Sequence, residues 1–302
     1  MPLTDHVAIV SLTSDIPAKS VLQAGAALQK QITRDFEPFW GFHATVDVFE
    51  NLDDVPSDYH PVVLFGDPDE LLGRLEFAIG EQYETKLIDD FERDRLTGLH
   101  LNAFTRQPFA LVEVTDAWSV TLGHEVLELI ADPYGNRLIA AAHPQNPGLR
   151  VLYLLEVCDP CMAVWYPVNG VPMPDFYTPR YFEPVDIDRT RYSFTGAIER
   201  PLDILEGGYL SYIDPRDSGL YQLTGDGGDI PIASIAELAR SSAPLRTVVD
   251  TNPRTPQVTR EALRPAISAA ASFRAVDAVG AASEGTALRT AQAAVSLATG
   301  AG

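Results

Sequence analysis

Residues 119–136, SVTLGHEVLELIADPYGN, carry one histidine and three acidic residues at spacings that suit metal chemistry. On a helix with His124 as the origin, Glu128 falls at about 40°, Asp132 at about 80° and Glu125 at about 100°. The opposite face of the helix is apolar. We therefore expect this helix to pack on a core while its ligand-type side chains line a cleft.

The pentad HEVLE resembles in spacing the ligand helix of a zinc site. Ligands at positions i and i+4 face the same way, and a glutamate beside the first ligand can polarise a metal-bound water. His124 and Glu128 hold the ligand positions, and Glu125 holds the position of the general base. Because a glutamate stands where a second histidine is usual, the added negative charge lowers the Lewis acidity of the ion. We expect Zn²⁺, with Ca²⁺ or Mn²⁺ as the alternatives.

A second acidic cluster follows the apolar stretch LRVLYLLEV. Carboxylates at the end of a buried strand are costly unless a positive group meets them. Glu156 is the preferred third metal ligand, and Asp132 is the second choice. Asp159 is either a ligand or an acceptor that holds His124 in one tautomer.

Two other interpretations apply to the same cluster. Its acids can end a turn and pair with Arg137 or Arg180 instead of a metal. Cys158 and Cys161 form a CxxC motif, but a redox motif needs a following helix, and MAVWYPVNG does not have a helical pattern. A structural zinc site would need a second pair of ligands, and the chain has only these 2 cysteines.

The apolar pattern predicts the elements that position these residues. Expected strands cover residues 7–12, 42–49 and 61–65, an expected helix covers 17–36, and an edge hairpin covers 98–104 and 108–114. The predicted fold class is α+β, with a mixed sheet whose edge hairpin packs on the site helix. The predicted divisions are an N-terminal lobe at 1–148 and an irregular, β-containing lobe at 149–240 that completes the site. An Ala-rich tail follows at 241–302, either a helix or a flexible segment.

Charge and hydropathy exclude several classes of function. The chain has 22 Lys and Arg against 42 Asp and Glu, a net charge of −20, which repels nucleic-acid phosphates and anionic lipid. No apolar stretch reaches the roughly 20 residues that a membrane span requires, and the N-terminus lacks the pattern of a signal peptide. We therefore expect a cytoplasmic protein with no nucleic-acid or membrane partner.

Several of these motifs together resemble a known family. The strand-helix start, the edge strand and HExxE are similar to the upper lobe of zincin-like metallopeptidases. The set HEVLELIADPYGN, LEVCDPC, FYTPRYF and GGYLSY is more closely similar to a group of bacterial and phage-encoded zincin-like proteins of unassigned activity. It also resembles, more distantly, the exordium-type, phosphate-induced proteins.

The resemblance covers residues 7–223 and implies a metal-binding, hydrolase-like fold. It implies a peptide or protein substrate, which the edge strand would hold by strand pairing. The alternative is a non-catalytic module with a degenerate zincin fold that binds a metal or a partner, such as a virion-associated structural component.

Overall fold

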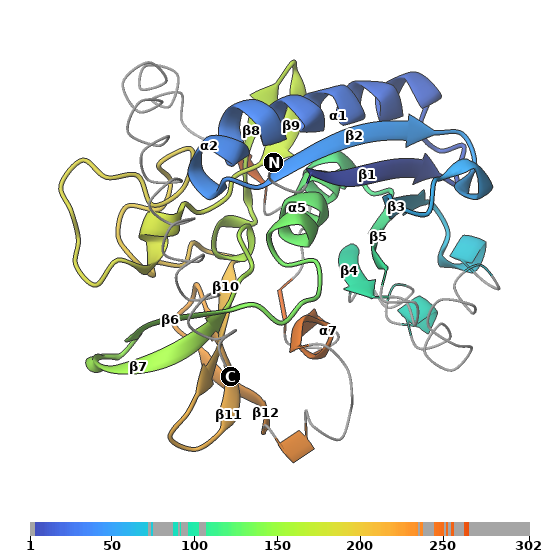
Figure 1. Cartoon of the computed structure of the whole chain (residues 1–302). Helices are drawn as coiled ribbons and strands as arrows, with labels where there is room; N and C mark the ends of the chain where they lie inside the picture. Colours follow the sequence, from blue (N-terminus) through green and yellow to red (C-terminus); the bar gives the residue numbers. More distant parts are fainter. Residues whose placement is uncertain are drawn as a thin grey trace, which may run out of the picture.

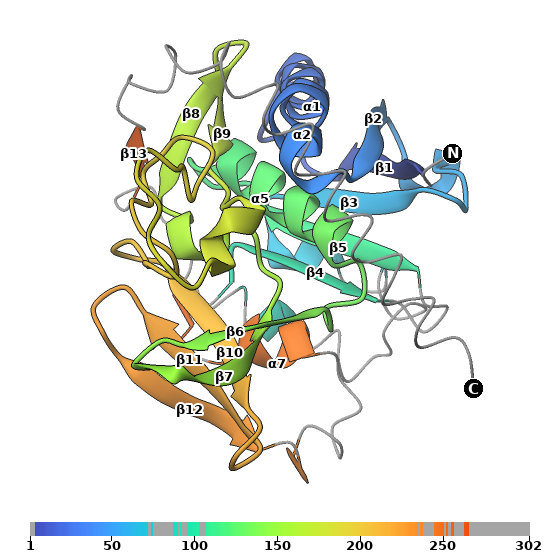
Figure 2. The ribbon, with the colours of Figure 1, turned by 60° about the vertical axis from the view of Figure 1, so that its left-hand side comes forward.

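The structure is a computed structural model, and it describes residues 4–71, 74, 87–89, 91, 96–102, 107–234, 236–237, 245–250, 252, 255–256 and 263–265. Its helices and several sheets are consistent with the α+β class. In Figures 1 and 2, helix α5 lies at the centre of the ribbon, with helix α1 on one side and the sheet of β6, β7, β10, β11 and β12 on the other.

The first sheet has the strand order β2-β1-β3-β5-β4. Its strands are β1 (Thr4–Ser11), β2 (His43–Phe49), β3 (His60–Phe65), β4 (Gly98–Asn102) and β5 (Pro108–Glu113). Neighbouring strands are parallel except β4, which pairs antiparallel with β5 at the edge. The three predicted strands and the edge hairpin are thus confirmed, although residues 103–106 of the hairpin lie outside the described residues.

Helices cover one face of this sheet. Helix α1 (Ala18–Gln31) continues into a π-helical turn (Ile32–Phe36) and the short helix α2 (Glu37–Trp40). Helix α5 (Trp118–Ala131) follows β5 and shares one core cluster with α1 and with alternate residues of the parallel strands. The other residues of β3 and β5, together with Leu99 and Leu101 of β4, form a second cluster. Since side chains alternate along a strand, His100 of β4 lies on the face that α5 covers.

The second sheet is antiparallel, with the order β12-β11-β10-β7-β6. Its strands are β6 (Leu138–His143), β7 (Asn146–Leu154), β10 (Tyr209–Asp214), β11 (Gly219–Thr224) and β12 (Asp229–Ser234). Strands β10, β11 and β12 lie within the lobe at 149–240 that was predicted to contain β structure, whereas β6 was not predicted. The boundary predicted at residue 148 falls inside β7, because the hairpin of β6 and β7 belongs wholly to this sheet.

A third, small sheet gives regular structure to part of the lobe at 149–240 that was predicted to be irregular. Strands β8 (Val164–Val168) and β9 (Val171–Pro174) form an antiparallel hairpin, and β13 (Arg264–Pro265) pairs with β8. The prolines and tyrosines in these strands interrupt the alternation of apolar and polar residues, so the sequence pattern does not predict the hairpin. Short 3₁₀ helices cover Leu52–Asp54, Pro68–Leu71, Asp159–Cys161 and Pro179–Phe182.

Only part of the predicted tail at 241–302 falls within the described residues. It includes helix α7 (Leu245–Asp250), which packs against β4. Among the described residues, no helix has the length and apolar character needed to cross a membrane.

Helix α5 passes close to strand β9 at Gly123. A Cβ atom on this residue would lie 2.4 Å from Cδ of Pro174 and 3.3 Å from the sulfur of Met173. An alanine inside a helix normally adds about 1 kcal/mol of stability over glycine, but here a rigid proline ring blocks it. We expect Gly123→Ala to lower the free energy of unfolding by about 1–3 kcal/mol, measured by urea denaturation. Gly148→Ala, whose nearest neighbour would be Asn146 Oδ1 at 3.5 Å, is the control and should change stability little.

Candidate metal centre

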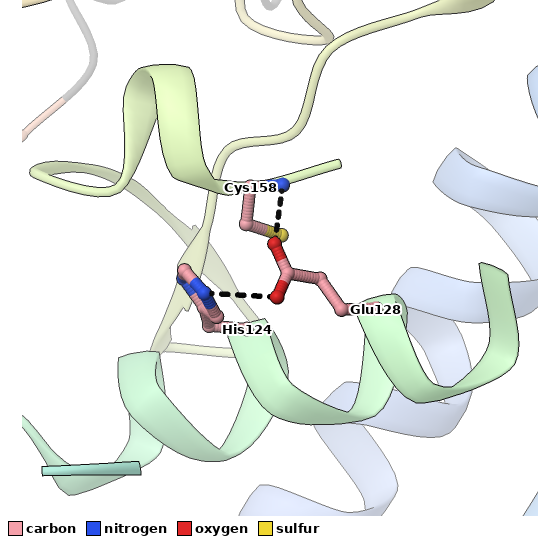
Figure 3. Close-up of side chains that lie close together, drawn as sticks. All are labelled: His124, Glu128 and Cys158. Carbon is pink, nitrogen blue, oxygen red and sulfur yellow. Dashed lines mark hydrogen bonds and ion pairs between the residues drawn. The ribbon is translucent and has the colours of Figure 1, made fainter. Parts of the chain in front are cut away.

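Helix α5 places His124 and Glu128 side by side. The Nε2 atom of His124 lies 3.2 Å from Oε2 of Glu128, one helical turn further on. Figure 3 shows both side chains leaving the helix toward the chain segment that carries Cys158. Both are buried, so the helix brings this pair into the interior rather than to an open surface.

The segment after β7 supplies the next contacts. The backbone N–H of Cys158 donates to Oε1 of Glu128 at 3.0 Å, which fixes the carboxylate (Figure 3). Ligand atoms of His124, Glu128 and Cys158 all lie within 4.8 Å of one another, and we call these residues the Cys158 group. Nitrogen, oxygen and sulfur ligands of this kind are those that zinc binds.

Asp159, which follows Cys158, contacts the same histidine. Its Oδ1 atom lies 3.1 Å from Nε2 of His124, so one ring nitrogen faces two carboxylates. Within the described part of the chain, Nδ1 of His124 has no hydrogen-bond partner. Asp159 is therefore placed where it can hold either the protonated imidazole or an ion bound beside it.

Strand β4 supplies a second histidine. His100, Glu128 and Glu156 form another set of ligand atoms within 4.8 Å of one another, which we call the His100 group. Nδ1 of His100 also lies 3.4 Å from Oε2 of Glu125. Glu128 belongs to both groups, so it is the central carboxylate of the site.

Arg246 of helix α7 is the cation that meets these acids in the structure. Its guanidinium contacts Glu128 at 2.9 Å, Asp159 at 3.0 Å and Asp250 at 2.6 Å, and it also pairs with Glu156. The arginine side chain is only 3% exposed. The alternative interpretation expected these acids to pair with Arg137 or Arg180. The structure instead pairs them with Arg246.

Burial and charge together shift the pKa values of the cluster. Burial alone would lower the pKa of His124, but Glu128 and Asp159 hold it well above its usual value. Burial would raise the pKa of Glu128, but Arg246 and His124 hold it below its usual value. Burial raises the pKa values of Glu156 and Asp159 against the influence of Arg246. The metal-free centre thus favours a charged His124–Glu128 pair.

Cys158 and Cys161 are both buried free cysteines. The N–H of Cys161 donates to the carbonyl of Cys158 at 3.0 Å, within a 3₁₀ turn. Burial raises the pKa values of both thiols well above the usual range, which opposes the thiolate that redox chemistry requires. Of the two, only Cys158 belongs to a ligand group.

A small cavity lies beside His124 and Asp159 of the candidate metal centre. It is lined by residues that include His124, Glu125, Asp159, Tyr209, Arg246 and Asp250, and about 10 Å³ is accessible to the centre of a water molecule. This is room for about one water or one ion. Helix α7 supplies part of the wall, so its position limits the space beside Glu125.

The sequence prediction missed several residues of the site. Arg246 and Asp250 were assigned to the tail, and His100 was interpreted as a packed or surface residue of a strand, although one that could point into the cleft. The i, i+4 spacing of Arg246 and Asp250 is the one local signal that pointed to a buried ion pair. Comparisons of the chain with protein-family models, with curated proteins and with solved structures find no match.

Asp132 does not join either ligand group. Its Oδ2 atom accepts the backbone N–H of Arg137 at 2.6 Å, in the turn that ends helix α5. We expect Asp132→Ala to lower the free energy of unfolding by about 1–3 kcal/mol, because a buried donor loses its acceptor. Metal affinity measured by calorimetry should not change. Asp132→Asn keeps an acceptor oxygen and should retain most of the stability, whereas a loss of metal with either variant would make Asp132 a ligand.

Proposed function

We propose that this chain is a zincin-like, metal-dependent hydrolase that holds one divalent ion with His124 and Glu128. The observation that carries the proposal is the pairing of these two side chains one turn apart. Their separation of 3.2 Å is close to the roughly 3.3 Å between two ligands bound to one tetrahedral zinc at about 2.0 Å. Asp159, Glu156 and Cys158 are the candidates for the remaining ligands.

The ligand atoms of the proposed site suit a cation. Among the described side chains, Oε2 of Glu128, Oδ1 of Asp159 and Oε1 of Glu156 are buried and have no hydrogen-bond donor of good geometry. Arg246 lies near the first of these oxygens and His124 near the second, whereas a divalent ion could contact several of them at once. Zn²⁺ is the ion that the mixed nitrogen, oxygen and sulfur set favours, and Ca²⁺ or Mn²⁺ would favour the carboxylates alone.

Glu125 is the residue we assign to proton transfer. It precedes Glu128 by three residues, and it lines the small cavity together with His124. A zinc ion held by His124 and Glu128 would supply Lewis acidity for hydrolysis of a peptide or other amide. Glu125 would take the proton of the attacking water, and its contact with His100 fixes the orientation of the carboxylate.

A second candidate is a non-catalytic module that binds a metal or a partner. Two observations favour it: Arg246 already neutralises part of the cluster, and the cavity holds about one water. In that case the acids would stabilise the fold, and the chain would act through its surface, for example in a virion or another assembly. Metal content separates a metal site from a purely ionic one, and turnover separates an enzyme from a binding module.

We expect purified protein to contain close to one equivalent of zinc, measured by plasma mass spectrometry. His124→Ala should lose it, because the substitution removes a ligand from the pair on α5. His143→Ala removes another buried histidine, one that lies beside Asp214 and outside both groups, and it should keep the metal. A wild-type protein that binds no Zn²⁺, Ca²⁺ or Mn²⁺, with a melting temperature unaffected by chelator, would contradict the proposal.

Glu125→Gln tests catalysis separately from binding. The amide cannot accept a proton at neutral pH, so we expect hydrolysis of a fluorescent casein substrate to fall by at least about 100-fold while the zinc content stays at the wild-type value. Glu50→Gln, on an exposed loop, is the matched control. If wild-type protein with bound metal has no activity that Glu125→Gln removes, the non-catalytic candidate is the better description.

A further inference from the structure

Arg246 lies among the carboxylates that a metal ion would use. It contacts Glu128, which belongs to both ligand groups, and Glu156, which belongs to the His100 group. It also contacts Asp159, whose other oxygen faces His124. A guanidinium is a permanent cation, since it does not lose its proton in proteins. The chain thus supplies its own positive charge to the centre.

A metal ion and Arg246 would compete for the same carboxylate oxygen. Nη2 of Arg246 lies 2.9 Å from Oε2 of Glu128, and this is the oxygen that lies nearest to His124. An ion bound to that oxygen at about 2.0–2.2 Å would lie within roughly 5 Å of the guanidinium. In a buried site with little water to screen them, two such cations repel strongly. The arginine in this position therefore opposes binding of the ion.

Helix α7 also has anchors outside the charged cluster, including its packing against β4. The backbone N–H of Leu245 donates to Oδ1 of Asn136 at 3.2 Å, and that of Arg246 donates to the carbonyl of Gly135 at 3.1 Å. Val249 is fully buried in a cluster with residues of the second sheet. The helix has 6 residues, and Arg246 is the one that ties it to the carboxylates of the centre.

We propose that Arg246 acts as an internal competitor for the cation site, so that metal binding displaces the arginine and loosens helix α7 from its place beside the cavity. Since α7 supplies Arg246 and Asp250 to the cavity wall, its release would widen the space beside Glu125. The structure with Arg246 bound is then the closed state of the centre. This inference rests on the metal site proposed above and names the event that would open it.

The test compares Arg246→Gln with wild-type protein after chelator treatment. Calorimetric titration with ZnCl₂ should show at least tenfold tighter binding to Arg246→Gln, because the competing cation is gone. In EDTA the variant should melt at a lower temperature, since its buried carboxylates have lost their counter-charge. Zinc should then raise its melting temperature more than that of wild-type protein. Arg216→Gln removes a partly exposed ion pair with Asp214 and should match wild type in the titration.

A measurement on wild-type protein keeps the test valid if Arg246→Gln does not fold. Hydrogen exchange of the amides of residues 245–250 should become faster when ZnCl₂ is added, because α7 loses its anchor. Arg246→Lys, which keeps a cation at the position, should bind zinc with an affinity nearer to wild type than to Arg246→Gln.

The outcomes separate the two proposals. Equal or weaker zinc binding by Arg246→Gln, or α7 exchange that zinc leaves unchanged, would overturn the competition while the metal site stands. Zinc binding by the variant alone would overturn the displacement, because Arg246 would then exclude the ion from the wild-type centre instead of being displaced by it. No binding of Zn²⁺, Ca²⁺ or Mn²⁺ by any of the proteins would overturn both.

Discussion

The balance of buried charge at the end of helix α5 is the constraint on which the centre of the structure depends. Glu128, Glu156, Asp159 and Asp250 are all buried, and Arg246 is the cation that contacts each of them. Removing one partner from a buried ionic cluster leaves an uncompensated charge, typically at a cost of about 3–5 kcal/mol. Helix α5, the segment after β7 and helix α7 must therefore meet at this point, whatever chemistry the site performs.

The same constraint explains why the site can be either structural or functional. A cluster with more acids than bases is stable only with an added cation or with some carboxyls protonated, and burial does raise the pKa values of Glu156, Asp159 and Asp250. Arg246 satisfies part of this need from within the chain. A divalent ion would satisfy it more completely, because one ion can contact several carboxylates and an imidazole at once. The surplus of negative charge would thus link the stability of the fold to the proposed binding of a metal ion.

Sequence patterns predicted the elements whose evidence is local and missed those set by contacts far along the chain. The parallel strands, the edge hairpin and the site helix follow from apolar periodicity over a few residues. The partner of Glu156 could not be found in this way, because Arg246 lies 90 residues away. Composition placed that arginine in an Ala-rich tail, yet helix α7 packs it against β4. The hairpin of β8 and β9 was missed because Pro167, Pro172 and Pro174 obscure its alternation.

The observed contacts of the four residues on the predicted helix face agree with the helical projection for some of these residues and differ from it for others. His124 and Glu128 lie within regular helix, and their side chains meet as the angles require. Asp132 is the C-cap, with φ −140° and ψ 74°, so its projected angle no longer applies and its carboxylate turns back to the N–H of Arg137. Glu125, at the edge of the face, contacts His100 on β4 rather than the segment after β7. The helix therefore directs His124 and Glu128 toward one neighbour and a separate carboxylate toward another, which is the division of roles that the proposed hydrolase would need.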